Sequence, residues 1–140
     1  MRALLALVFL ASCASAGDTR SPADRVAGCW INRDVGVSTM RWLPDPAHAG
    51  VLIGSKLVYS QSGANRATRY SLSQGVEAWG LCELDATGAS TVCWQVAQGQ
   101  GGSLDGGRAF IDASGDALRI AVIGAGPEQI IFQGRRDGCD

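Results

Sequence analysis

The sequence predicts an all-β fold, and two observations carry that prediction. From residue 26 onward, runs of apolar and β-branched residues alternate with clusters of Gly, Ser, Asp, Asn and Pro at a spacing of roughly ten residues. No apolar pattern of helical period continues for the length of a helix. Eight or nine consecutive short strands fit best in a small antiparallel up-and-down barrel, because closure removes the exposed edges of an open sheet. A β-sandwich is the alternative.

The expected strands follow one another with short connections. Their ranges are 26–32, 37–43, 51–60, 68–73, 76–84, 91–98, 108–113, 117–123 and 129–134. Turn-forming residues separate them, for example at 33–36 and 62–65. The glycine-rich connection over 99–107 is the candidate for a mobile lid.

The hairpin formed by the fifth and sixth expected strands fixes a register. If Thr87 and Gly88 form a two-residue turn, Cys82 lies directly opposite Cys93, within disulfide reach and on the outer wall. Alternate residues then share the buried face. The residues expected to point inward are Trp79, Leu81, Val92, Trp94 and Val96, with Leu118, Ile120 and Val122 in a later strand.

The first residues have the layout of an export signal. An apolar run follows Arg2 and is too short to span a bilayer. It ends in Leu10-Ala11-Ser12-Cys13, which resembles a bacterial lipobox, and this resemblance implies cleavage before Cys13 and acylation of its thiol. Cleavage after Ala16 is the alternative. We expect a signal peptide at 1–12, a flexible tether at 13–24 and a single barrel domain at 25–140.

An acylated Cys13 would hold the domain at an envelope membrane through the lipid anchor only. Ala14 follows the cysteine, which resembles the pattern of outer-membrane lipoproteins that face the periplasm. If the signal is instead cleaved after Ala16, the protein would be soluble in the periplasm or secreted.

The remaining cysteines predict a disulfide framework. Of the five cysteines, Cys13 is either acylated or lost with the signal, which leaves an even set of four in an oxidising compartment. Beside Cys82 with Cys93, we favour Cys29 with Cys139, because that bridge ties the first strand to the end of the closed sheet. Zinc is disfavoured, since the spacing contains no Cys-x-x-Cys pair.

Three segments near the start of the expected barrel carry a family resemblance. They are Val-Ala-Gly-Cys-Trp at 26–30, Met-Arg-Trp-Leu-Pro at 40–44 and Val-Leu-Ile-Gly-Ser at 51–55. Together they resemble a family of lipocalin-like secreted bacterial domains of unassigned role, which implies a small barrel. The Asn-Pro-x-His-Asp-Phe-Pro segment of that family is absent here. The Ala-Gly-x-Trp opening is also similar to periplasmic barrel inhibitors of metalloproteases, which implies that residues 14–24 act as an inhibitory arm.

Few residues are arranged for catalysis or cofactor binding. His48 is the only histidine, and the sequence places no metal-ligand or triad partners beside it. The glycine-rich stretches at 99–102 and 124–127 do not open a helix, as a phosphate loop requires. The net charge of −1 and the lack of a basic stripe give no sign of nucleic-acid binding. We expect no enzyme, metal or cofactor, and acid–base catalysis by Glu77 or Glu83 is a distant alternative.

Aromatic residues are the remaining candidates for function. Aromatic side chains at a barrel mouth can hold an apolar or planar ligand, whereas Trp30 is expected to plug the closed end. The ligand candidates are Trp42, Trp79, Trp94, Tyr59 and Tyr70. The sequence therefore predicts non-enzymatic binding of a small hydrophobic ligand. The alternative is an interaction or inhibitor module that engages an envelope protein through its tether or its 99–107 loop.

Overall fold

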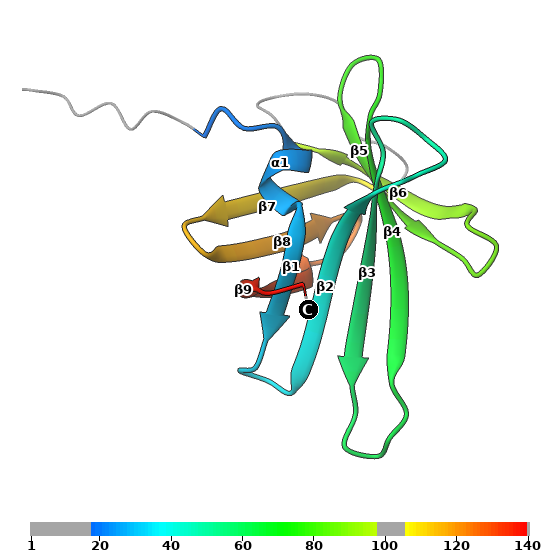
Figure 1. The fold of residues 1–140 in the computed structure, drawn as a ribbon. Helices are drawn as coiled ribbons and strands as arrows, with labels where there is room; N and C mark the ends of the chain where they lie inside the picture. Colours follow the sequence, from blue (N-terminus) through cyan, green and yellow to red (C-terminus); the bar gives the residue numbers. More distant parts are fainter. Residues whose placement is uncertain (1–17, 98–105, 140) are drawn as a thin grey trace, which may run out of the picture.

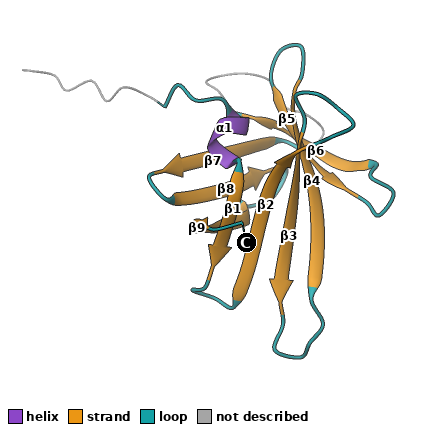
Figure 2. Cartoon of the chain, in the orientation of Figure 1, coloured by secondary structure: helices purple, strands orange, loops and turns teal. Residues whose placement is uncertain are grey.

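The computed structural model describes residues 18–97 and 106–139, which form one short helix and nine strands (Figures 1 and 2). The elements are α1 (Pro22–Val26), β1 (Gly28–Asn32), β2 (Val37–Pro44), β3 (Leu52–Tyr59), β4 (Arg66–Gln74), β5 (Trp79–Leu84), β6 (Ser90–Val96), β7 (Arg108–Ser114), β8 (Ala117–Ile123) and β9 (Gln129–Asp137).

The strands form one closed barrel in sequence order, and β1 pairs with β9 to complete the ring. This confirms the expected all-β barrel over the sandwich. One pair differs from the expected up-and-down pattern, because β6 and β7 run parallel, with Gln95 opposite Arg108 and Val96 opposite Ala109. The cause is the odd number of strands. Strand direction cannot alternate all the way around a closed ring of nine, so one neighbouring pair must be parallel.

The β5–β6 hairpin confirms the predicted register but not the predicted turn. Cys82 lies opposite Cys93 and Glu83 opposite Val92. A bulge at Leu84 then shifts the register, and the turn is longer than Thr87 and Gly88. The Asp85 N–H donates to the Ala89 carbonyl at 2.9 Å, and Gly88 adopts a φ of +87°. Asp85 therefore opens a wider, glycine-dependent turn.

Both predicted disulfides are present. Cys29 bonds to Cys139 across a sequence separation of 110 residues, and Cys82 bonds to Cys93 across 11. The predicted inner face is also confirmed, since its central residues are buried. They are Leu81, Trp94, Val96, Leu118, Ile120 and Val122. The Cys82–Cys93 bridge consequently lies on the outer wall.

Residues 21–24 belong to the folded domain, which corrects the expected flexible tether over 13–24. The Ser21 hydroxyl caps α1 by accepting the Asp24 N–H at 3.1 Å, and Pro22 and Val26 are buried. Residue 26, expected to start a strand, therefore ends a helix. Residues 13–17 lie outside the described residues.

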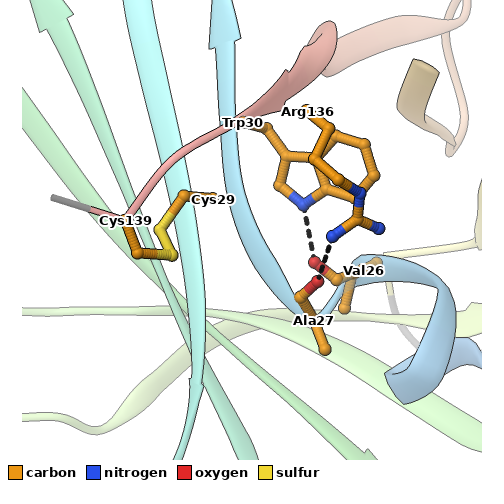
Figure 3. The surroundings of a disulfide bond; sticks show 6 residues. All are labelled: Val26, Ala27, Cys29, Trp30, Arg136 and Cys139. Atoms are coloured by element: carbon orange, nitrogen blue, oxygen red, sulfur yellow. Dashed lines mark hydrogen bonds between the residues drawn. A yellow bond between two sulfur atoms is a disulfide. The ribbon is translucent and has the colours of Figure 1, made fainter. Parts of the chain in front are cut away.

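The helix closes one end of the barrel, which we call the helix end. The Trp30 indole N–H donates to the Val26 carbonyl at 2.7 Å, so that Trp30 plugs this end as expected. The Arg136 guanidinium lies 4.3 Å from the centre of the indole ring and also donates to the Ala27 carbonyl (Figure 3). The Cys29–Cys139 disulfide lies on the other side of β1 in the same view.

The N-terminal segment also covers a gap in the sheet. Only two residue pairs join β6 to β7, which leaves the later part of the β7 edge without a strand partner. The carbonyl of Ile111 accepts from Arg25 at 3.4 Å, and the carbonyl of Ala113 accepts from Arg20 at 3.1 Å. In Figure 1, α1 lies beside β7. Residues 18–26 thus protect an open strand edge.

Candidate functional site

The deepest aromatic group of the interior is Trp42 on β2. Its side chain is 1% exposed, and its ring lies against Gly54 on β3, where a Cβ would come within 2.7 Å of the indole. The indole N–H of Trp42 is buried and has no hydrogen-bond partner. An unpaired buried donor is costly, so this N–H is a polar group available to a bound molecule.

Lys56 spans the interior of the barrel. On β3 it shares a face with Leu52 and Gly54, which are buried. Its ammonium group donates to the Ile131 carbonyl of β9 at 2.5 Å. Because β3 and β9 are not neighbours in the ring, this hydrogen bond crosses the lumen.

A bulge in β9 makes the Ile131 carbonyl available. Ile130 pairs with Ala121 and Phe132 pairs with Ile120, so Ile131 is the extra residue between two ladder positions. An extra residue in a bulge has no ladder partner. The Lys56 side chain therefore satisfies a backbone acceptor that the sheet itself leaves unpaired.

Three further ionisable groups lie on the inner faces of β4 and β5 near Lys56, and the outermost of them, Arg66, is exposed at the hairpin end of β4. Arg66 and Tyr70 share the inner face of β4, and Glu83 lies opposite Tyr70 on β5. We call Lys56, Arg66, Tyr70 and Glu83 the lumen cluster. The sequence analysis placed Glu83 on the apolar face near a strand end, and the register confirms that position.

The electrostatics show how closely the lumen cluster is coupled. Burial lowers the pKa of Lys56, the positive charge of Arg66 lowers it further, and Glu83 opposes both effects. Burial raises the pKa of the Tyr70 phenol to about 12, and the charge of Glu83 contributes to the same shift. Lys56 and Tyr70 therefore lie in a partly desolvated environment.

Solvent reaches the interior at the end opposite α1, which we call the hairpin end. It carries the turns at 33–36, 60–65, 85–89 and 124–128. Val58, on the same face of β3 as Lys56, is 37% exposed there. A pocket of about 200 Å³ opens beside Trp94 and is also lined by Val122 and Gln129. The lumen cluster thus lies between this mouth and the apolar interior.

The five predicted ligand residues do not form one site. Trp42, Tyr70 and Trp94 are buried in the barrel interior. Trp79 lies toward the helix end, where it lines two open grooves of about 440 and 600 Å³. Tyr59 pairs with Val37 on the outer face and is 44% exposed. Ligand contact by any of them stays a prediction.

The other sequence candidates lie on the surface. The His48 imidazole is 73% exposed, and its Nδ1 lies 2.8 Å from an Asp45 carboxylate oxygen. A backbone N–H from Ala47 and the contact with His48 lower the pKa of that carboxyl. The stretch 124–127 connects β8 to β9 and opens no helix, as expected. Most of the 99–107 loop lies outside the described residues, as does Cys13.

Sequence reasoning missed Lys56 as a residue of the barrel interior, although a signal for it existed. The alternation that buries Leu52 puts residues 54, 56 and 58 on the same inner face, so a lysine at 56 is a charge inside a barrel. The bulge at Ile131 gave no comparable signal.

The sequence matches no protein-family model, and neither the curated proteins nor the solved structures contain a significant match. The barrel implied by the lipocalin-like resemblance is confirmed by the structure. The resemblance to that family rests on the three opening segments alone. Within residues 18–97 and 106–139, no helix is long and apolar enough to cross a membrane. Among the same residues, no three His, Cys, Asp or Glu side chains are grouped as metal ligands.

Proposed function

We propose that this protein is an exported, non-enzymatic binding protein. It binds a small, largely apolar ligand inside its barrel, and the ligand enters at the hairpin end. The observation that carries the proposal is the hydrogen bond from the Lys56 ammonium group to the Ile131 carbonyl across the lumen, which we call the Lys56 bridge. A lysine whose ammonium group crosses the lumen and a buried Trp42 indole N–H without a partner fit the pattern of a few polar groups set in an apolar wall.

The arrangement of the two ends supports this proposal. At the helix end, Trp30, Val26 and Pro22 are almost completely buried. At the hairpin end, Val58 is partly exposed and a pocket reaches Trp94. A ligand would therefore enter at the hairpin end, and the apolar residues below the lumen cluster would contact its apolar part.

The first experiment is a native mass spectrum of the full chain, purified from an exporting bacterial host, followed by a denatured spectrum of the same sample. We expect extra mass that is lost on denaturation. Thr68→Phe on the lumen face of β4 should reduce that extra mass, because a larger side chain narrows the lumen.

Thr39→Phe, on the outer face of β2, is the matched control and should retain the extra mass. A native mass equal to the denatured mass, together with failure to bind added apolar probes, would overturn the proposal.

We further propose that the protein is anchored in the cell envelope, in the outer membrane facing the periplasm, through a lipid on Cys13. Two disulfides indicate an extracytoplasmic location, and the lipobox resemblance supplies the acylation site. Incorporation of an alkyne-labelled fatty acid should be seen in the wild type and lost in Cys13→Ala. Equal labelling of both proteins would contradict acylation at this residue.

An interaction module for an envelope protein is the second candidate. The observation that favours it is Val76, which is fully exposed in the β4–β5 turn beside the groove of about 440 Å³ lined by Glu77 and Trp79. The inhibitory-arm version is less well supported, because residues 18–24 are held against the barrel by Arg20 and Arg25. Site-specific crosslinking from position 76 in cells tests this candidate. A defined protein adduct would support it, and the absence of any adduct would contradict it.

A further inference from the structure

The hydrogen-bonding groups of the lumen are unbalanced toward donors. The ammonium of Lys56, the guanidinium of Arg66 and the indole N–H of Trp42 are donors only. The Tyr70 hydroxyl can donate or accept. The acceptors facing them are the Glu83 carboxylate and the Ile131 carbonyl, and the hydroxyl of Thr68, opposite Lys56, can donate or accept. A molecule that enters this space therefore meets more donors than acceptors, and it must itself supply acceptors.

The charges of the lumen are unbalanced in the same direction. Along the inner faces of the described strands, the ionisable side chains at the hairpin end are Lys56, Arg66, Glu83 and the phenol of Tyr70. Two positive groups thus face one carboxylate, since the phenol is neutral at physiological pH. Arg136 lies at the helix end over Trp30 and leaves this balance unchanged. The lumen cluster therefore carries a net positive charge, with Lys56 and Glu83 partly buried and Arg66 exposed at the hairpin end.

We infer that the ligand is an amphipathic acid whose anionic oxygen head group, a carboxylate or a phosphate monoester, is held by Lys56 and Arg66. This inference rests on the proposed function and adds the chemical class of the ligand. The head group would stay in the lumen cluster near the mouth, and the apolar chain would extend toward Trp42, Leu72 and Phe132, which are buried.

On ligand binding, the Lys56 ammonium group would exchange one hydrogen-bond acceptor for another. In the unliganded barrel, the ammonium group donates to the Ile131 carbonyl and crosses the lumen. An anionic head group is a stronger acceptor for an ammonium group than a neutral backbone carbonyl, because it adds the attraction between two opposite charges to the hydrogen bond. Lys56 would therefore turn from Ile131 to the head group and open the lumen for the apolar chain.

The test compares three probes that share one chain length: dodecanoate, dodecyl phosphate and dodecanol, each below its micelle-forming concentration. Binding to the full chain is measured by calorimetry and by quenching of tryptophan fluorescence. We expect both anions to bind the wild type at least about tenfold more tightly than dodecanol. The tighter of the two anions identifies the carboxylate or the phosphate as the preferred head group.

Lys56→Met keeps an unbranched side chain, one atom shorter, and removes the charge. It should abolish the preference for the anions while retaining dodecanol binding. Arg69→Met removes a positive charge from the exposed outer face of the same β4 strand that carries Arg66, and should leave the preference intact. If Lys56→Met does not fold, Arg66→Gln at the hairpin end allows the same comparison of anion binding with dodecanol binding.

The outcomes separate this inference from the proposed function. Dodecanol binding equal to that of both anions, unchanged in Lys56→Met, overturns the anionic head group but keeps a lumen binding site. Failure of all three probes to bind overturns the binding function itself.

A direct readout follows from the sequence, because Lys56 is the only lysine in the chain. In protein labelled with ¹³C- and ¹⁵N-lysine, a single side-chain signal reports the ammonium group. We expect this signal to shift on addition of dodecanoate. An unmoved signal at saturating dodecanoate would contradict the exchange from Ile131 to the head group.

Discussion

At the scale of single residues, the contact between Trp42 and Gly54 fixes the shape of the interior. The indole lies where a Cβ on Gly54 would be, within 2.7 Å of the ring carbons. Gly54→Ala should therefore force the ring or the strand to move, and we expect a loss of unfolding free energy of roughly 1 to 3 kcal/mol. Urea unfolding followed by tryptophan fluorescence measures this loss.

Gly126→Ala is the matched control, because a Cβ at that loop position meets no atom within 4 Å and the backbone does not adopt a positive φ. The urea concentration at the midpoint of its unfolding should stay close to that of the wild type. Equal midpoints for the two variants would show that Trp42 adjusts without cost.

Tyr70 makes stability depend on pH in the alkaline range. Its pKa is about 12 in the folded protein, against an ordinary value of 10.0, mainly because of burial. Below pH 10 the phenol is protonated in both the folded and the unfolded state, so its full contribution to the free energy of unfolding is present. As the pH rises from 10 to 12, only the unfolded state ionises, and stability falls by roughly 2 kcal/mol.

Urea midpoints between pH 9 and pH 12 measure this effect. The wild type should lose more stability over that range than Tyr70→Phe. Tyr59→Phe removes a phenol that is 44% exposed and serves as the control. A wild type and a Tyr70→Phe variant with parallel pH profiles would argue against a desolvated Tyr70.

At the scale of elements, α1 and the preceding residues act as a clamp on β7. The Arg25 side chain donates to the carbonyls of Asp18, Arg20 and Ile111. Arg25→Ala should therefore release the clamp, reduce the unfolding free energy by roughly 1 to 2 kcal/mol and speed trypsin cleavage after Arg20. Unfolding curves and timed proteolysis measure these two effects.

Arg41→Ala, an exposed residue on the outer face of β2, is the comparison for Arg25→Ala. It should change neither stability nor cleavage after Arg20 appreciably. If trypsin cleaves Arg25→Ala as slowly as the wild type, the other contacts of residues 18–26 are enough to hold this segment against β7.

The same elements show how far sequence reasoning extends. Alternation predicted which residues of β5, β6 and β8 face inward, because a half-buried strand repeats every second residue. It did not predict α1, since a helix of residues 22–26 is too short to show a helical period. The parallel β6–β7 pair was also missed, because a local pattern does not encode the direction of the next strand.

The candidate site was predicted in part for the same reason. Trp42 and Trp94 were identified because they lie on inward faces of strands. The Lys56 bridge depends on Ile131, a residue 75 positions away whose carbonyl is left unpaired by a bulge. Bulges arise from the pairing of whole strands and have no fixed local signature in this segment.

At the scale of the whole molecule, the barrel is closed in two ways. Hydrogen bonds between β1 and β9 complete the ring, and the Cys29–Cys139 disulfide covalently joins the same two parts of the chain. The helix end is filled by Trp30 and α1, whereas the hairpin end carries the charged lumen cluster. The covalent closure and the Trp30 plug thus lie at one end of the barrel, and the ionisable side chains of the lumen at the other.

The two disulfides should differ in what they contribute to this closure. A cross-link stabilises mainly by restricting the unfolded chain, and the effect grows with the length of the loop that it closes. For separations of 110 and 11 residues, the chain-entropy relation gives about 4.8 and 2.8 kcal/mol. Removing Cys29–Cys139 by a double Cys→Ala change should therefore cost about 2 kcal/mol more than removing Cys82–Cys93.

Urea unfolding of the two double variants, prepared from the same oxidising compartment, measures this difference. Each variant keeps the other disulfide, so the two proteins have equal numbers of cysteines and serve as controls for each other. Because Cys29–Cys139 holds the ends of the ring, its loss should also speed hydrogen exchange in β1 and β9 before the other strands. Equal stabilities would contradict the chain-entropy account of the two cross-links and would indicate residual structure in the unfolded chain.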